Sequence, residues 1–234
     1  GNFCRSFKRQ MDGKRRRLDL LLSHFHMDHL MGLYGSSFLF DPQMEVHIYG
    51  ERPGEKSLKE CLCQMFGPPY WPLPLDQLPA LIRFHEIQAG DVFLLEDQIR
   101  VQTLSVHPGG SILGRREEAT QGSEPASIVY GLDCELTDAM FQKLKEFAGA
   151  CGLLICDACY TEAELLLRQG WGHGSIERCR KLRQASGAQQ ALFMHYERSY
   201  QDTFLREQEK ISLAQDPACL FAREGMALKV HGQG

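Results

Sequence analysis

The stretch His24-Phe25-His26-Met27-Asp28-His29 decides how this chain of 234 residues is interpreted. It follows the apolar run Leu18-Asp19-Leu20-Leu21-Leu22, which is typical of a buried strand. Four side chains that can bind a metal ion thus lie together after a strand. Three imidazoles so close in sequence repel one another when protonated, unless a cation organises them. The stretch therefore predicts the first half of a two-metal hydrolytic site.

The composition is that of an ordinary globular protein. Hydrophobic residues make up 43% of the chain and charged residues 24%, so the chain is able to bury a sizeable core. A formal net charge of −4 excludes a global basic field that would attract nucleic acid. The N-terminal segment is an exception, and it is either a phosphate-attracting patch or a solvated helix face. Its basic residues are Arg5, Lys8, Arg9, Lys14, Arg15, Arg16 and Arg17.

The targeting signals and the cysteines point to the cytoplasm. No apolar run is long enough for a transmembrane helix, and the basic start lacks the apolar segment of a secretory signal. The nine cysteines are odd in number and scattered. Cys156-Asp157-Ala158-Cys159 has the spacing of a redox motif or zinc knuckle, but no second such pair completes a tetrahedral site. We expect reduced thiols and no contact with a membrane.

The order of the predicted elements indicates an α/β protein with its chemistry on loops at one edge. We expect strands over 18–22, 46–50, 81–86, 91–95, 99–105, 127–132, 153–156 and 191–194. We expect helices over 57–66, 137–149, 176–185 and 202–214, with a short one along Phe3, Phe7 and Met11. Ser57 and Glu60 are spaced as a capping box, and the polar residues 117–124 suit a hairpin tip. No linker indicates a boundary, so a single domain over 1–234 is expected.

Three more donors at strand ends suit the second half of a dinuclear site. Such a site needs two cations about 3.5–4 Å apart with a water between them. His24 and His26 alternate along an extended segment, so their rings point the same way. His107, Asp133 and His195 each follow a predicted strand, where a loop brings them to a shared edge. Taken singly, each is more simply explained as a cap or an ordinary loop residue.

The His-x-His-x-Asp-His segment after an apolar strand resembles the signature of metallo-β-lactamase-fold hydrolases. The resemblance runs from Leu18 to Asp202 and includes the segments PPYWPLPLDQLPA, HPGG, YGLDCE, DACYTEAE and GWGHGS. It is similar to a bacterial group close to ribonuclease Z and its phosphodiesterase relatives. The resemblance implies an α/β, four-layer αββα sandwich that holds two divalent metal ions, zinc with manganese or iron as alternatives.

The resemblance also implies how the ligands are shared between the ions. His24, His26 and His107 would hold one metal, Asp28, His29 and His195 the other, and Asp133 would bridge them. Asp28 counts among the catalytic candidates as well. An alternative makes Asp157 the bridging ligand and gives Asp133 a structural role.

A second pair of residues matches a proton-donor dyad of the ribonuclease Z branch. By resemblance, His173 of the GWGHGS segment pairs with Asp157 of DACYTEAE. A carboxylate orients an imidazole and raises its pKa, and the imidazolium then protonates a departing oxygen. In the alternative interpretation His173 is only the residue that precedes a helix capped by Ser175.

Two departures from the family pattern stand out. The last metal histidine is commonly followed by His, Asp and Pro, whereas this chain reads His195-Tyr196-Glu197-Arg198. Relatives also carry the first strands of the sandwich and a Gly-Gly-Asn turn before the point where this chain begins. We therefore expect an N-terminally truncated sandwich with an exposed sheet edge.

The expected function is phosphodiester hydrolysis by a metal-bridged hydroxide, with the His173 and Asp157 pair protonating the leaving group. A small phosphodiester or nucleotide is favoured over RNA because no long basic arm is inserted in the fold. A homodimer is possible by resemblance. The alternatives are a thioesterase or lactonase on the same metal site, and a non-catalytic metal-binding module.

Overall fold

The computed structural model describes residues 16–96, 99–106, 113–119 and 126–230, and within them the chain forms two compact units. Unit 1 is Gly1–Gln88 and unit 2 is Ala89–Gly234. Each is described by itself, and the single domain expected from the sequence stays a prediction. Among the described residues, no helix combines the length and apolar character that crossing a membrane requires.

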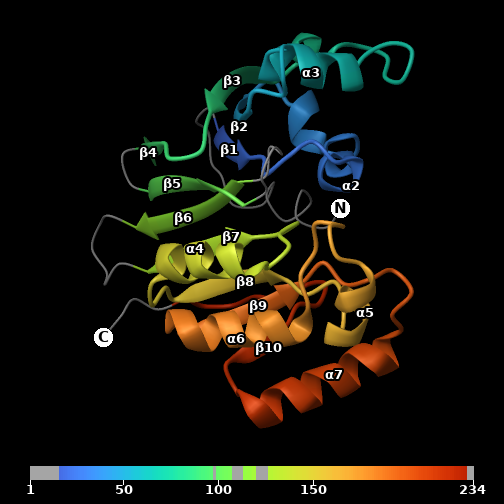
Figure 1. Cartoon of the computed structure of the whole chain (residues 1–234). Coiled ribbons are helices and arrows are strands. Elements are labelled where there is room, and N and C mark those ends of the chain that lie inside the picture. The colour runs from blue at the N-terminus through green and yellow to red at the C-terminus, as the bar shows by residue number, and fades with distance from the viewer. Residues whose placement is uncertain (1–15, 97–98, 107–112, 120–125, 231–234) are drawn as a thin grey trace. The chain divides into compact units, whose positions relative to one another are not determined.

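Unit 1 is built on a three-stranded parallel sheet in the order β1-β2-β3 (Figure 1). Its strands are β1 (Arg16–Leu21), β2 (Met44–Glu51) and β3 (Leu81–Ile87). Its α-helices are α2 (Met27–Leu30) and α3 (Leu58–Met65). Short 3-10 helices cover Met31–Leu33, Ser37–Phe40 and Leu75–Gln77.

One face of this sheet makes the core of unit 1. Val46 and Ile48 alternate along β2 and are fully buried, as the two-residue period of a strand requires. They pack in one cluster with Leu58 and Leu62 from α3. The capping box predicted at Ser57 is confirmed, because its hydroxyl accepts the N–H of Glu60 and the Glu60 carboxylate accepts the N–H of Ser57.

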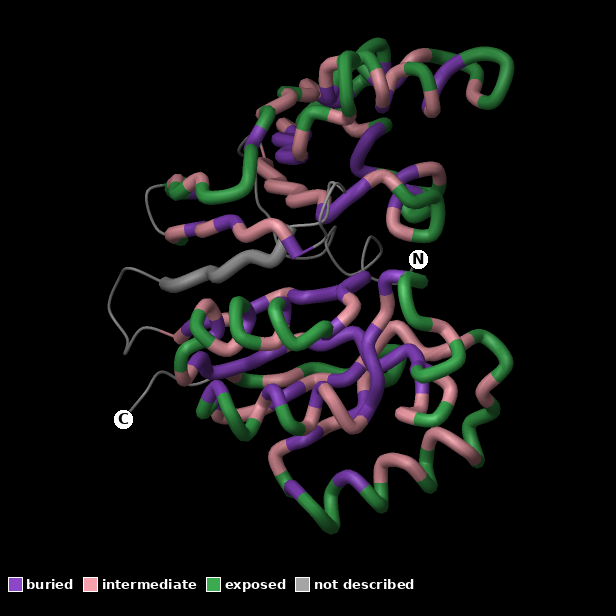
Figure 2. The backbone as a smooth tube through the Cα atoms, viewed as in Figure 1, coloured by how far each residue is buried: buried purple, intermediate pink, exposed green. Residues whose placement is uncertain are grey.

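Unit 2 contains a seven-stranded sheet in the order β10-β9-β8-β7-β6-β5-β4. The strands from β4 to β7 are antiparallel, and those from β7 to β10 are parallel. They are β4 (Val92–Leu95), β5 (Ile99–Ser105), β6 (Leu113–Ala119), β7 (Ser127–Gly131), β8 (Leu153–Asp157), β9 (Gln190–Met194) and β10 (Cys219–Phe221). Figure 2, coloured by residue burial, shows that most residues of β7 and β8 are buried.

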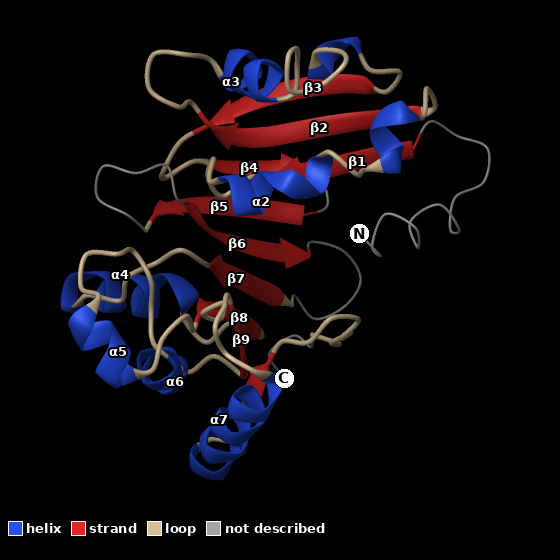
Figure 3. Ribbon diagram, turned by 90° about the vertical axis from the view of Figure 1, so that its right-hand side faces the viewer, coloured by secondary structure: helices blue, strands red, loops and turns tan. Residues whose placement is uncertain are grey.

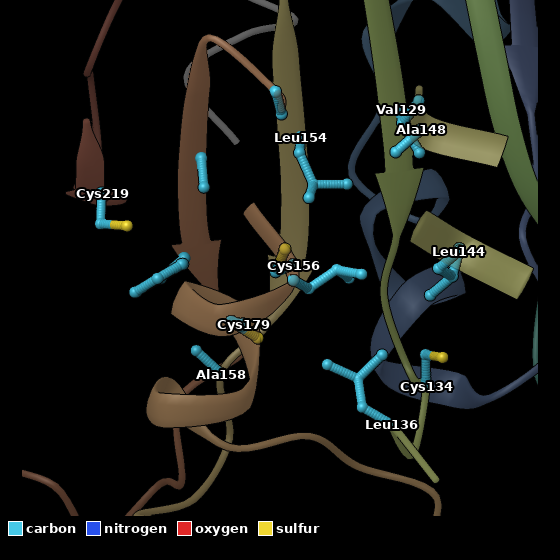
Figure 4. Packing of buried hydrophobic residues seen from close by; sticks show 14 of the residues in the cluster. Val129, Cys134, Leu136, Leu144, Ala148, Leu154, Cys156, Ala158, Cys179 and Cys219 are labelled. Atoms are coloured by element: carbon cyan, nitrogen blue, oxygen red, sulfur yellow. The ribbon is translucent and has the colours of Figure 1, made fainter. Parts of the chain in front are cut away.

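Four helices accompany the parallel part of that sheet. They are α4 (Asp138–Ala148), α5 (Glu162–Leu167), α6 (Ile176–Ser186) and α7 (Asp202–Gln215). Helices α4 and α6 pack against each other on one side of the sheet, and α6 also contacts β8 and β9 (Figure 3). Leu144 of α4 and Cys179 of α6 meet Val129 and Leu154 of the sheet in the main core (Figure 4).

The parallel arrangement of β7, β8 and β9 fixes where chemistry can occur. Gly131 pairs with Cys156, and Asp157 pairs with Met194. The carboxyl ends of the three strands therefore lie at one edge, where loops of an α/β sheet commonly carry functional groups. Asp133, Asp157 and His195 sit at these three ends.

Most predicted elements are confirmed within a residue or two, and two predictions are corrected in part. The polar residues 117–124 were expected to be a hairpin tip, but residues 117–119 belong to β6, which pairs antiparallel with β7, and residues 120–124 lie outside the described residues. Arg16 and Arg17 are part of β1 rather than of a solvated helix, and they form ion pairs with Asp41 and Asp19. The predicted helix along residues 3–11 and the basic residues up to 15 lie outside the described residues.

Candidate metal centre and proton-donor dyad

In unit 1, three imidazoles gather where the chain leaves β1 and enters α2. The His24 ring lies 4.3 Å from the His26 ring and 4.3 Å from the His29 ring, centroid to centroid. The tight spacing follows from the local structure, because His26 is extended at the N-cap of α2 and His29 lies in that helix. The prediction that the histidines of this stretch converge is therefore sound within unit 1.

The surroundings of His24 and His29 suit metal ligation. His24 is buried, and its Nδ1 lies 3.1 Å from the Ser23 hydroxyl, so Nε2 is the nitrogen that would bind an ion. The Asp28 carboxylate lies 3.4 Å from Nε2 of His29. Neutral imidazoles and a carboxylate are the donors that zinc, manganese and iron accept.

In unit 2, the ends of β7, β8 and β9 bring together carboxylates and imidazoles. Nε2 of His195 lies 3.5 Å from Asp133 Oδ1, and its Nδ1 lies 3.7 Å from Asp157 Oδ2. Asp133 and Asp157 are buried. Asp133 and His195 have φ of +48° and +65°, a region that side chains with a Cβ enter only at a cost. Such backbone strain clusters at functional sites, where it aims a side chain.

His173 and Asp157 form the pair that the sequence predicts. His173 Nδ1 lies 2.9 Å from Asp157 Oδ2, and the other carboxylate oxygen accepts the N–H groups of Cys159 at 3.1 Å and Gly174 at 3.3 Å. The two imidazoles and two backbone N–H groups thus surround the buried Asp157 carboxylate. The His195 ring also stacks on the His173 ring, with centroids 5.0 Å apart. The arrangement fixes the orientation of both imidazoles.

The cysteine beside this pair is a weaker donor. Asp157, Cys159, His173 and His195 each offer one ligand atom, and these atoms lie within 4.8 Å of one another. Burial raises the pKa of Cys159 to about 12, so its thiol is protonated at neutral pH. Because a thiolate is the form that binds metal, imidazole and carboxylate groups are the better ligands here. The eight cysteines in the described part of the chain form no disulfide with one another, and their reduced state stays a prediction.

The donor set fits divalent metal ions in each unit. Unit 1 assembles four of the predicted ligands, which are His24, His26, Asp28 and His29, while unit 2 assembles Asp133 and His195 next to the His173 and Asp157 pair. His107, the remaining predicted ligand, lies outside the described residues.

The sequence did not point to Glu135, which holds the loop that carries His173. Its carboxylate accepts the N–H of Gly170 at 2.8 Å and the N–H of Gly172 at 3.2 Å. A lone glutamate before a helix carries no sequence signal for such a role, because its partners are more than thirty residues away. The three glycines of the GWGHGS segment were the available hint of an unusual loop.

Fold and site together define a class of protein: an α/β protein that gathers imidazoles and carboxylates beside strand ends, as metal-dependent hydrolases do. Residues 5–196 match the family model of the beta-lactamase superfamily domain, and the chain belongs to this superfamily. No protein of curated function matches the chain by sequence.

Solved structures place the chain within the metallo-β-lactamase fold. The metallo-beta-lactamase fold protein YhfI from Bacillus subtilis is 18% identical with a TM-score of 0.62, and the match covers 89% of this chain and 76% of that chain. A diphosphatase from the PhnP family is 16% identical with a TM-score of 0.59, covering 93% and 74%. The short form of human tRNase Z is 14% identical with a TM-score of 0.62, covering 91% and 78%. The predicted α/β metallo-β-lactamase fold is confirmed.

Proposed function

We propose that this superfamily member is a phosphodiesterase that depends on two divalent metal ions. The observation that carries the proposal is the 2.9 Å contact between His173 Nδ1 and the buried Asp157 carboxylate, directly beside His195. An oriented imidazole next to metal donors supplies what a diester with a poor leaving group requires, which is a proton for the departing oxygen.

The proposed metal ligands are those that the family resemblance implies. His24, His26 and His107 would hold one ion, Asp28, His29 and His195 the other, and Asp133 both. When bound, two such ions lower the pKa of a water towards about 7 and neutralise charge on the phosphoryl oxygens. Zinc is the first choice of metal, and the same donors accept manganese or iron.

The chain's own residues divide the remaining work. Asp157 holds His173 through Nδ1, so Nε2 is the atom from which the proton would pass to the leaving oxygen. Asp157 Oδ1 already accepts two backbone N–H groups, which favours Asp133 over Asp157 as the bridging ligand. Asp28 would act by binding metal rather than by moving a proton, because it is exposed and lies beside His29.

The substrate proposal draws on the names of two structural relatives. The structural relatives include a PhnP-family diphosphatase and a human tRNase Z, whose names indicate phosphorus esters or RNA. We propose a small phosphodiester or nucleotide for this chain, with RNA as the less favoured substrate. A cytoplasmic location and a homodimer complete the proposal.

The test compares two reactions in the metal-loaded protein. We expect hydrolysis of bis(p-nitrophenyl) phosphate and of a cyclic nucleotide, with little activity on a panel of thioesters and lactones. We expect His173→Ala to slow hydrolysis of the cyclic nucleotide on the order of a hundredfold, because the alkoxide that leaves must be protonated. The p-nitrophenolate that leaves bis(p-nitrophenyl) phosphate needs no proton. Faster thioester hydrolysis that His173→Ala leaves unchanged would instead identify a thioesterase. Bound metal without turnover of any ester would identify a binding module.

A further inference from the structure

The loop that carries His173 is tethered at both ends, and the two tethers differ in kind. On the far side of His173, Gly174 donates to Asp157 and accepts the N–H of Tyr160 at 3.1 Å, so this end is bonded to β8 and the residues that follow it. On the near side, the N–H groups of Gly170 and Gly172 both point at the Glu135 carboxylate. The Glu135 side chain therefore holds the near end, where the Trp171 N–H also donates to the carbonyl oxygen of Arg168 at 3.2 Å.

The backbone of this near end is shaped to bind a carboxylate. Gly170 and Gly172 have φ of +82° and +85°, which only glycine adopts without strain. N–H groups that converge from such a turn form a concave anion-binding nest. Trp171 between them is 65% exposed, so its ring adds little apolar packing that could hold the loop in place.

Glu135 also lies two residues after Asp133, the proposed bridging ligand. The short segment 133–135 thus connects a metal donor to the tether of the proton donor. Asp133 Oδ1 lies 3.7 Å from His173 Nδ1, so one end of that segment approaches His173 and the other binds its loop. A carboxylate at 135 can set the position of His173 without touching a substrate.

We propose that Glu135 is a positioning residue for the proton donor. By binding Gly170 and Gly172 it holds His173 against Asp157, and it thereby sets the efficiency of leaving-group protonation. This inference rests on the proposed function of His173. It predicts that loss of the Glu135 carboxylate harms only those reactions whose leaving group must be protonated.

The experiment measures kcat/KM of Glu135→Ala and Glu135→Gln on two diesters with different leaving groups. With a cyclic nucleotide we expect kcat/KM of Glu135→Ala to fall about tenfold, which is part of the loss expected for His173→Ala. With bis(p-nitrophenyl) phosphate we expect kcat/KM to stay within about twofold of wild type. Glu135→Gln keeps one oxygen that accepts an N–H, so it should recover most of the loss. Glu177→Ala is the matched control, because it removes a carboxylate of α6 paired only with Arg180 and Lys181 among the described ion pairs.

The outcomes separate this inference from the proposed function. If His173→Ala itself slows both diesters equally, the proton-donor role of His173 fails. If His173→Ala is selective for the cyclic nucleotide but Glu135→Ala is not, the positioning role of Glu135 is wrong. Should Glu135→Ala fail to fold, Glu135→Gln decides the matter, since an equal loss on both diesters would overturn the inference.

Discussion

At the scale of single residues, Gly174 shows how closely the loop of His173 packs against β8. A Cβ built at this position would lie 2.3 Å from the carbonyl oxygen of Asp157 and 3.3 Å from that of Cys134. Real Cβ atoms do not approach backbone oxygens so closely, and neither oxygen is able to swing aside as a side chain does. The absence of a side chain here is what lets the Gly174 N–H reach the Asp157 carboxylate.

Gly174→Ala should therefore displace the loop and the histidine with it. We expect the free energy of unfolding to fall by about 2–3 kcal/mol, as for other overpacked positions, measured by urea denaturation. Gly32→Ala is the control, because a Cβ there meets nothing within 4 Å and stability should change by less than about 0.5 kcal/mol. Equal stability of the two variants would show that the loop is not packed against β8 as described.

The sequence identified residues with a chemical signal and missed those that act through geometry. The histidines at 24, 26 and 29 stand in a compact motif, and Asp157 ends an apolar run, so residue type and position sufficed. Glu135 and Ser23 have no such signal, because their roles depend on which backbone groups and rings the fold brings near them. The strain at Asp133 and His195 is likewise a property of the folded backbone.

At the scale of elements, strand pairing between distant segments determined the secondary structure where the local sequence pattern did not predict it. The residues of β6 are charged and lack alternation, yet they form a strand because β5 and β7 pair with both of its edges. The short elements α5 and β10 were not predicted, since six and three residues give too little periodicity. Elements with a strong local signal, such as the capped helix at Ser57, were predicted correctly.

One ion pair ties α6 to the loop that precedes β10. Nη1 of Arg183 lies 3.0 Å from the buried Asp216 carboxylate, and Nη2 donates to the carbonyl oxygen of Gln189 at 3.1 Å. Burial alone would raise the pKa of Asp216, but the N–H of Ala218 and the Arg183 guanidinium outweigh it and lower the pKa. Asp216 thus stabilises the fold above its unfolded pKa, and that contribution is lost as the pH falls through the folded pKa.

Arg183→Met should remove part of this stability in a pH-dependent way. At pH 7 we expect a loss of about 2 kcal/mol in the free energy of unfolding, typical of hydrogen bonds to a charged group. The difference from wild type should shrink as the pH falls below the unfolded-state pKa of aspartate, about 3.9, towards the lower folded-state pKa of Asp216, and thermal unfolding across pH measures it. Arg180→Met, which breaks a pair with Glu177, should cost under about 0.5 kcal/mol. A difference that does not change with pH would refute the role given to Asp216.

At the scale of the whole molecule, the family was readable from sequence and the sheet order was not. The motif at 24–29 and the later segments indicated the metallo-β-lactamase fold, which the match over residues 5–196 confirms. The order β10-β9-β8-β7-β6-β5-β4 joins antiparallel and parallel strands, and no local pattern specifies which strands become neighbours. The imidazoles and carboxylates of each unit are the kinds of ligand that the proposed metal site requires.

The most direct test of the central claim is the rate of bis(p-nitrophenyl) phosphate hydrolysis as zinc or manganese is titrated into metal-stripped protein. We predict no turnover without metal and a rate that saturates near two equivalents, with Asp133→Ala inactive at every ratio. Turnover that survives metal removal, or bound metal that never produces turnover, would contradict the account.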